Sequence, residues 1–460
     1  MNTYINDDTI CAISSPSGSG AIALIRISGK QAENIVTQCF KHSPKKNLSD
    51  RKCVYGQFYD GEYLVDDIVV TLYKAPNSYT GEDLLELSCH GSNFIQQYIL
   101  NLLVAKGARL ALPGEFTYRA FKNGKLDLTR SEAVADLIAA ENAQAHDVAM
   151  SQLKGTYAGK IASLRKRLLE LTSLFELELD FAEEDVEFAK KEDLLALMDE
   201  IESNLEELID SFKMGNALKN GIAVAIIGRP NVGKSTLLNR LLNEDKAIVS
   251  DIPGTTRDVV EDVITIGGFP FRFIDTAGLR DTEDEIETLG MEKTLQRINQ
   301  AEIVLHVFDA GTMEKDDLMK EIDEFRQHAT AEKKWIMIGN KVDQLETLPS
   351  YFTELQSMDC IYISAKRNEN IKLVTDDLLA YVKSKHVTGS TVVTNVRHVQ
   401  AMQQTLEHIT SAEDGILSGV PMDLTAIDLR QAGYYLGTIT GEITNTEILD
   451  NIFGNFCIGK

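Results

Sequence analysis

The sequence lacks the features that mark secreted, membrane-spanning and metal-cluster proteins. Its 460 residues contain six cysteines and no C-x-x-C pair, so the sequence predicts neither a zinc knuckle nor a disulfide framework. No apolar run approaches the roughly 18 residues that span a membrane. The first residues show no basic segment followed by a long apolar run. We therefore expect reduced thiols, a cytoplasmic location and no membrane partner.

Positive charge is also scarce. Lys and Arg number 46 against 70 Asp and Glu, which gives a net charge of −24, and residues 176–210 hold 15 of the acids against two lysines. Because binding to nucleic acid phosphates needs clustered Lys and Arg, this segment would repel RNA. Apolar residues recur through it at spacings of three and four, which predicts a helix whose acids face solvent. The recurring positions are Leu194, Leu197, Ile201, Leu205, Leu208 and Phe212.

The composition that remains is that of a globular chain, with 43% hydrophobic residues, 31 Gly and 9 Pro, and the length predicts about three domains. Residues 1–120 combine short β-like runs with a helix-like segment closed by Gly107, which predicts an α+β domain. Helical patterning starts at Thr129, where Thr129 and Glu132 have the spacing of a capping box. We therefore expect the first part of a helical domain over residues 121–220.

The pattern changes twice more along the chain. Over residues 221–383 short apolar runs alternate with helix-like segments, which is the pattern of an α/β nucleotide-binding fold. Over residues 384–460 helical patterning returns. The sequence therefore predicts an α/β domain inserted into a helical domain whose two parts meet in space.

The stretch GRPNVGKS, residues 228–235, matches a phosphate-binding loop directly after a predicted strand and before a predicted helix. Glycines allow backbone N–H groups to close around phosphates, Lys234 can reach the β and γ phosphates, and the Ser235 hydroxyl can bind Mg²⁺. A plain glycine-rich turn is the alternative. We predict a nucleoside triphosphate site and assign Lys234 a catalytic role.

Two later segments favour guanine as the base. Asp343 in NKVD, residues 340–343, can accept hydrogen bonds from the ring N–H and the amine of guanine, whereas adenine presents a different set of donors. SAK, residues 364–366, follows the last predicted strand and fits a loop behind the base. We predict GTP rather than ATP.

Two further segments resemble switches that sense the γ-phosphate. SDIPGTTRD, residues 250–258, places Thr255 and Thr256 between the phosphate loop and Asp275, and a simple turn is the alternative. In DTAGLR, residues 275–280, Asp275 can hold the Mg²⁺ shell through water, and the backbone N–H of the glycine can meet the γ-phosphate. The next residue is a leucine, which cannot orient a water as the glutamine of many small GTPases does. The predicted GTP-binding residues are Asn231, Val232, Gly233, Lys234, Ser235, Thr236, Ser250, Asp251, Ile252, Pro253, Gly254, Thr255, Thr256, Asp275, Thr276, Ala277, Gly278, Asn340, Lys341, Asp343, Ser364, Ala365 and Lys366.

These motifs, with PNSYTGEDLLEL, RAFKNGKLDL and the terminal FCIGK, resemble the MnmE (TrmE) family of tRNA modification GTPases from end to end. The resemblance implies a multidomain α/β protein with an N-terminal α+β tetrahydrofolate-binding domain, a helical domain and an inserted Ras-like α/β P-loop G domain. It implies a homodimer through the N-terminal domain. It also implies a heterotetramer or larger complex with a flavin (FAD)-dependent partner of the MnmG/GidA family. Together the two proteins would build a carboxymethylaminomethyl or aminomethyl group on C5 of the wobble uridine of certain tRNAs. The chain's acidity suggests that the partner holds most of the tRNA.

The same resemblance indicates which groups could replace the water-orienting glutamine that this sequence lacks. It implies a potassium site formed by Asn231, Ser250, Ile252 and Thr255, a Mg²⁺ site that includes Ser235 and Thr256, and a water-orienting catalytic Glu287. A monovalent cation beside the phosphates can neutralise charge as an arginine finger does elsewhere. From the residues alone, Asn231 could equally be a turn-favouring asparagine, and Glu287 one more solvated acid.

Four residues match the family's site for 5-formyltetrahydrofolate: Arg26, Glu86, Lys125 and Lys460. A carboxylate can pair the amide-like edge of a pterin, and cations suit its glutamate tail or formyl oxygen. Without the resemblance each of these residues would be read as a surface charge. Cys457 in FCIGK stands fourth from the end, but the flanking residues do not suit prenylation. Two roles remain open for it, a reactive thiol near the folate and a small buried packing residue, and we favour the second.

Two other functions remain as alternatives. A ribosome-assembly GTPase switch would need a basic RNA-binding domain, for example a KH fold with its G-x-x-G loop, and neither flank supplies one. A membrane-remodelling GTPase would need a basic amphipathic helix or a lipid anchor. We therefore favour a potassium-stimulated GTPase that takes part in tRNA modification.

Overall fold

The computed structural model describes residues 8–42, 48–180, 191–244, 262–274, 291–329, 333–347, 360–385, 392–454 and 456–459. The chain forms two compact units, and each is described by itself. The first unit contains residues 1–139, 149–205 and 400–460, and the second contains residues 140–148 and 206–399. The predicted division into four segments stays a prediction.

The N-terminal part of the first unit is built on a seven-stranded mixed sheet in the order β3-β4-β5-β6-β2-β1-β7. Its strands are β1 (Ile10–Ile13), β2 (Ile22–Ser28), β3 (Phe40–His42), β4 (Cys53–Asp60), β5 (Tyr63–Tyr73), β6 (Leu84–His90) and β7 (Arg109–Leu110). The alternating residues of these strands form a core with α1 (Ala32–Cys39) and α2 (Asn93–Ala105). The expected α+β architecture of this region is confirmed.

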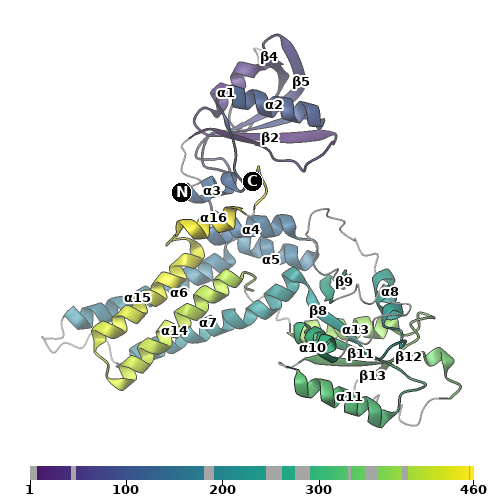
Figure 1. Cartoon of the computed structure of the whole chain (residues 1–460). Coiled ribbons are helices and arrows are strands. Elements are labelled where there is room, and N and C mark those ends of the chain that lie inside the picture. Colours follow the sequence, from purple (N-terminus) through teal and green to yellow (C-terminus); the bar gives the residue numbers. More distant parts are fainter. Residues whose placement is uncertain are drawn as a thin grey trace. The chain divides into compact units, whose positions relative to one another are not determined.

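Helices make up the rest of the first unit (Figure 1). They are α3 (Glu115–Lys122), α4 (Leu128–Ala139), part of α5 (Ala143–Leu153), α6 (Thr156–Asp180), part of α7 (Lys191–Asn220), part of α14 (Val396–Ser418), α15 (Met422–Thr440) and α16 (Thr446–Gly454). Arg165 of α6 pairs with Glu442 just beyond α15, and Glu176 of α6 pairs with Arg430 of α15 at 2.9 Å. The two helices are therefore antiparallel, and the helical segments that flank the second unit in sequence pack together as predicted.

The start of α4 differs from the predicted capping box. The helix begins at Leu128, and the Asp127 carboxylate accepts a hydrogen bond from the backbone N–H of Arg130 at 2.8 Å. The Thr129 hydroxyl donates to the same carboxylate and is buried inside the first turn. Asp127 is thus the capping residue, because its carboxylate, one residue before the helix, accepts from a backbone N–H of the first turn.

The second unit contains a six-stranded sheet in the order β13-β12-β11-β8-β10-β9, in which only β9 is antiparallel to its neighbour. Its strands are β8 (Ile222–Ile227), β9 (Asp262–Ile266), β10 (Phe269–Phe273), β11 (Ile303–Asp309), β12 (Lys334–Asn340) and β13 (Cys360–Tyr362). Five of the six correspond to the apolar runs of the sequence, and β9 was not predicted.

Helices cover both faces of this sheet, which is why its parallel strands are apolar on both sides. α8 (Lys234–Glu244) and α13 (Ile371–Lys385) pack on one face. α10 (Met291–Gln300) and α11 (Lys315–His328) pack on the other. A short 3₁₀ turn at Val342–Gln344 follows β12. Because β8, β11 and β12 run parallel to one another, their carboxyl ends lie at the same edge of the sheet.

The last described residues return to the N-terminal sheet. Ile458 forms an antiparallel bridge with Pro113, and the Ser14 hydroxyl donates to the Gly459 carbonyl at 3.0 Å. A Cβ at Gly459 would lie 2.3 Å from the Ile13 carbonyl oxygen, so only glycine fits. Cys457 in this segment is exposed. The expectation of a buried packing role for it is therefore wrong, because the segment runs along a surface with Phe456 buried and both Cys457 and Ile458 exposed.

Within the described residues, no helix combines the length and the apolar character needed to cross a lipid bilayer.

Candidate functional site

The loop between β8 and α8 is pressed against two neighbouring strands. Gly228 has φ +142°, and a Cβ there would lie 2.0 Å from the Val307 carbonyl oxygen of β11. Gly233 has φ +97°, and its Cβ would lie 2.3 Å from the Asn340 side-chain nitrogen. Asn231 also has a left-handed backbone, at φ 59°, which asparagine tolerates better than most residues. The two glycines are thus required by close approach, and the loop adopts one compact path.

Lys234 opens helix α8 and folds back over this loop. Its ammonium donates to the backbone carbonyls of Gly228 and Arg229, both at 2.8 Å. Ser235 and Thr236 follow in the first turn, where backbone N–H groups lack partners within the helix and the helix dipole favours an anion. The arrangement suits a phosphate group.

Asn340 joins three predicted segments. Its side-chain nitrogen donates to the Val232 carbonyl at 2.8 Å, and its side-chain oxygen accepts from the Ala365 N–H at 3.0 Å. The residue is 3% exposed. Next to it, Lys341 has a left-handed backbone and forms an ion pair with Asp309 at 2.9 Å. The phosphate loop, NKVD and SAK are therefore parts of one site.

Asp343 lies beside the SAK loop. The Ser364 hydroxyl donates to one of its carboxylate oxygens at 2.7 Å, and the Arg367 guanidinium lies 3.8 Å from the other. The hydrogen bond from Ser364, with Arg367 and Lys366 nearby, holds the pKa of Asp343 below its ordinary value against the effect of desolvation. The carboxylate is charged at neutral pH and can accept two N–H donors from a base.

Arg240, on α8, is a site residue that sequence reasoning missed. Its guanidinium donates to the carbonyls of Ala365 and Lys366, each at 2.9 Å. Hydrogen bonds from a charged donor are stronger than neutral ones. The helix that begins at the phosphate loop therefore holds the SAK loop as well. No motif signals this role, because the contact joins residues more than a hundred positions apart.

Several predicted nucleotide-site residues lie outside the described part of the chain. They are those of residues 250–256 and 275–278, with Glu287, and they include the predicted Thr256 ligand of Mg²⁺ and three of the four predicted potassium ligands. The described residues that the structure brings together are Asn231, Val232, Gly233, Lys234, Ser235, Thr236, Asn340, Lys341, Asp343, Ser364, Ala365 and Lys366.

A second group of predicted residues gathers on the N-terminal sheet. Arg26 of β2 and Glu86 of β6 are opposite each other in the ladder and form an ion pair at 2.8 Å. The Arg26 guanidinium lies 5.7 Å from the centre of the Tyr79 ring. Lys125 donates to the Pro76 carbonyl at 2.9 Å, in the same loop as Tyr79. Lys460 lies outside the described residues. Arg26 and Lys125 thus contact one loop, and Glu86 is joined to it through Arg26.

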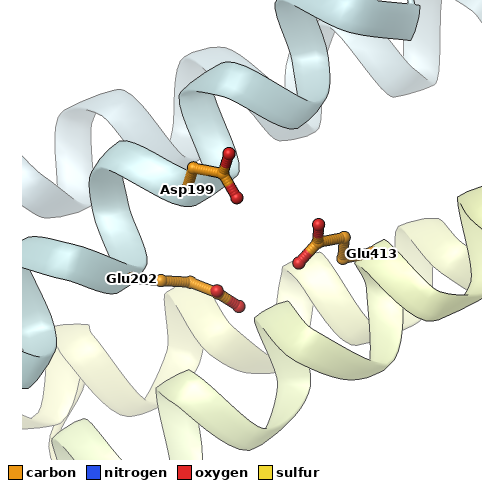
Figure 2. A group of neighbouring side chains, drawn as sticks. All are labelled: Asp199, Glu202 and Glu413. Atoms are coloured by element: carbon orange, nitrogen blue, oxygen red, sulfur yellow. The ribbon is translucent and has the colours of Figure 1, made fainter.

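Three acidic side chains also converge in the helical part of the first unit (Figure 2). Asp199 and Glu202 of α7 and Glu413 of α14 place carboxylate oxygens within 4.8 Å of one another. Such oxygens suit Mg²⁺ or Ca²⁺. The group is exposed or half-buried, and Glu202 already accepts from the Thr410 hydroxyl at 2.9 Å. We assign no ion to it, because converging acids are ordinary on so acidic a surface.

The phosphate loop after β8, the aspartate after β12 and the mostly parallel sheet that carries them define a P-loop G domain. Two family models match the chain: "GTP-binding protein TrmE N-terminus" over residues 9–125 and "MnmE helical domain" over residues 128–457. The chain belongs to the MnmE family of tRNA modification GTPases.

Relatives named "tRNA modification GTPase MnmE" match along almost the whole chain. The protein of Flavobacterium psychrophilum is 47% identical over 99% of this chain and 100% of its own length. The protein of Christiangramia forsetii is 48% identical over 99% of both chains, and that of Bacteroides thetaiotaomicron is 47% identical over 99% of this chain and 100% of its own. A solved structure of the G domain of the T. maritima FeoB iron transporter covers 35% of this chain and 98% of that chain at 24% identity, with a TM-score of 0.25, too low to support an argument.

Proposed function

We propose that the chain hydrolyses GTP at the loop between β8 and α8, as one subunit of an enzyme that modifies tRNA. The observation that carries the proposal is the Asn340 side chain, which bonds both the phosphate loop and the SAK loop. A phosphate-binding loop alone does not choose a base. Here the residues that can read guanine are tied to those that can hold phosphates, so the two requirements of GTP binding are met by one connected site.

The described residues have distinct roles in this proposal. The Lys234 ammonium, oriented by the carbonyls of Gly228 and Arg229, binds the β and γ phosphates, while the N–H groups at the start of α8 surround them. The Ser235 hydroxyl, in the first turn of α8, is a suitable ligand for Mg²⁺, which when bound neutralises charge on the phosphates. Asp343 selects the base. We retain the domain division at residues 1–120, 121–220, 221–383 and 384–460 for this assignment.

Hydrolysis also requires charge neutralisation and an oriented water, and we assign these to a potassium site that includes Asn231 and to Glu287. Asn231 is part of the phosphate loop and has a left-handed backbone, and its side-chain carbonyl oxygen is an acceptor of the kind that can bind a monovalent cation. The ion, when bound, would supply positive charge where an arginine finger acts elsewhere.

The test is the release of phosphate from GTP by the full-length protein in matched KCl and NaCl buffers with Mg²⁺. We expect faster hydrolysis in KCl. Glu287→Ala should lower kcat while GDP affinity persists, because a residue that orients water acts in the transition state and not in ground-state binding. Equal rates in both salts, with a Glu287→Ala variant as fast as the parent, would contradict the assignment of both groups.

We assign the pair Arg26 and Glu86, with Lys125 and Lys460, to a reduced folate that supplies the one-carbon unit. The fit rests on the donor set: the carboxylate of Glu86 is held by Arg26 at the surface of the sheet, with an aromatic ring, Tyr79, against the guanidinium. A flat heterocycle with an amide-like edge suits such a group. The same tRNA reaction needs a flavin-dependent partner, and we propose that this partner and a second copy of the chain complete the enzyme.

A further inference from the structure

A cavity of about 190 Å³ borders the phosphate loop on the side of β11 and α11. Its lining includes residues 229–232 of the loop, residues 306–309 of β11, and Glu321 of α11. Arg229 is 53% exposed and has this open space beside it. Packing alone therefore does not fix the arginine, and its position depends on what its guanidinium binds.

Glu321 is the residue that binds it. The Arg229 Nε donates to one carboxylate oxygen of Glu321 at 3.0 Å, and the His306 Nε2 lies 3.2 Å from the other. Glu321 itself is only 17% exposed. Desolvation would raise the pKa of Glu321, but the bonds from His306 and Arg229 outweigh it and hold that pKa below its ordinary value. The carboxylate is charged and joins the loop to β11 and α11.

His306 has no packing reason to be a histidine. It is fully buried on β11, and its neighbours on the same face of the strand, Val304 and Phe308, are apolar. Its Nδ1 atom is buried and bonds to nothing in the described part of the chain. Because a buried nitrogen without a partner is unfavourable, an apolar residue would be the better choice for packing. The His306 ring also lies edge-on to Phe325, which an apolar ring could do as well, so the bond to Glu321 is the contact that an apolar residue could not make.

In the phosphate loop, these contacts lead to Lys234, the residue proposed to bind the phosphates. The backbone carbonyls of Gly228 and Arg229 are the two acceptors of the Lys234 ammonium. Fixing the Arg229 side chain restricts the rotation of the backbone that carries its carbonyl. Glu321 therefore acts on Lys234 through Arg229, without touching the nucleotide.

We propose that Glu321 is a positioning residue for GTP hydrolysis, which holds the phosphate loop in the geometry that Lys234 needs and is itself oriented by the buried His306. The inference rests on the proposed GTPase function. It differs from a surface ion pair that merely adds stability, since exposed pairs of that kind contribute little and would not change the kinetics of hydrolysis.

The experiment compares full-length Glu321→Ala, Glu321→Gln and Arg229→Ala with Asp323→Ala, a matched loss of an exposed acid on the same helix. We expect kcat/KM for GTP to fall about tenfold in Glu321→Ala and in Arg229→Ala, as for one lost charge-assisted hydrogen bond. Asp323→Ala should match the parent. Glu321→Gln keeps an acceptor for Arg229 and should recover most of the activity.

The double variant Glu321→Ala with Arg229→Ala completes the cycle. If the two residues act as one unit, the double variant loses no more than either single variant. Unchanged kcat/KM in the single variants, or losses that multiply, would overturn the inference. If Glu321→Ala does not fold, the exposed Arg229→Ala carries the same test. Absence of GTP hydrolysis in the parent would instead refute the proposed function, so the two failures are distinguishable.

Discussion

At the scale of single residues, the site depends on polar groups whose charge state is set by their immediate partners. Asp343 is the clearest case, because Ser364 donates to its carboxylate and its pKa is held below the ordinary 3.8, through that hydrogen bond first, despite desolvation. A lowered pKa means that the charged form is favoured in the folded site. Its contribution is therefore complete above the ordinary pKa and is lost only as the pH falls through the lowered value.

The variant Asp343→Asn tests the base preference directly. We expect GDP affinity to fall by roughly 10²- to 10⁴-fold, because two charge-assisted hydrogen bonds of about 1.5–3 kcal/mol each are lost. Xanthosine diphosphate should bind the variant better than the parent, since its second carbonyl accepts from the new amide. Isothermal titration with both nucleotides measures the change. In the parent, the contribution of Asp343 to GDP affinity should not change between about pH 5 and pH 8. An unaltered preference for GDP in the variant would show that Asp343 does not read the base.

At the scale of elements, the site is assembled by contacts between segments that are distant in sequence. α8 begins with Lys234 at the phosphate loop, and two turns later Arg240 bonds the carbonyls of Ala365 and Lys366. In the trans peptide between Ala365 and Lys366, the carbonyl and the N–H point in opposite directions. Since the Ala365 carbonyl faces Arg240, the N–H of Lys366 points away from it. One helix thus positions the phosphate-binding residues at its start and orients the SAK backbone from its middle.

Arg240→Ala is expected to weaken binding of GDP and of inosine diphosphate by a similar factor, about tenfold. Both bases carry the carbonyl that an N–H of the SAK loop would meet, and they differ only in the amine that Asp343 reads. Fluorescence titration with the two nucleotides gives the ratio. Arg240→Lys, which can keep one of the two bonds, serves as the conservative control. Selective loss of GDP binding, or no loss of either, would contradict an orienting role for Arg240.

The elements of the second unit were predictable where one physical rule dominates. A parallel strand buried on both faces is expected to be apolar; β8 follows that rule throughout, and β11 and β12 follow it apart from His306 and the polar residues at their ends. β9 is a short edge strand with alternating exposure, and its Val-Ile-Thr-Ile run is a strand signal that our prediction missed. In the first unit, the predicted start of α4 was wrong because Thr129 and Glu132 have the spacing of a capping box, whereas in the structure the Asp127 carboxylate caps the helix. Arg240 and Glu321 could not be predicted, since their partners are fixed only by the fold.

At the scale of the whole molecule, the chain's two ends serve one structural region. Phe456 packs with Phe453 and Leu128, and beyond it Ile458 and Gly459 meet Pro113 and Ser14 at the N-terminal sheet. Ser14 follows β1, whose Ala12 is paired with Arg26 of the proposed folate group. The α/β insertion therefore separates, in sequence, two segments that meet in the first unit.

Removal of residues 456–460 tests whether the far terminus contributes to folate binding. We expect 5-formyltetrahydrofolate to bind the shortened protein more weakly than the parent by about tenfold or more, because a cation that can pair the folate carboxylates is lost. Lys460→Ala is the matched control, since it keeps the packing of Phe456 and the bridge of Ile458 and removes only the charge. If Lys460 is a ligand, both variants lose affinity; if the segment acts through packing, only the deletion does, together with a lower melting temperature. A folded deletion variant with the parent's folate affinity would show that neither the lysine nor its segment belongs to the site.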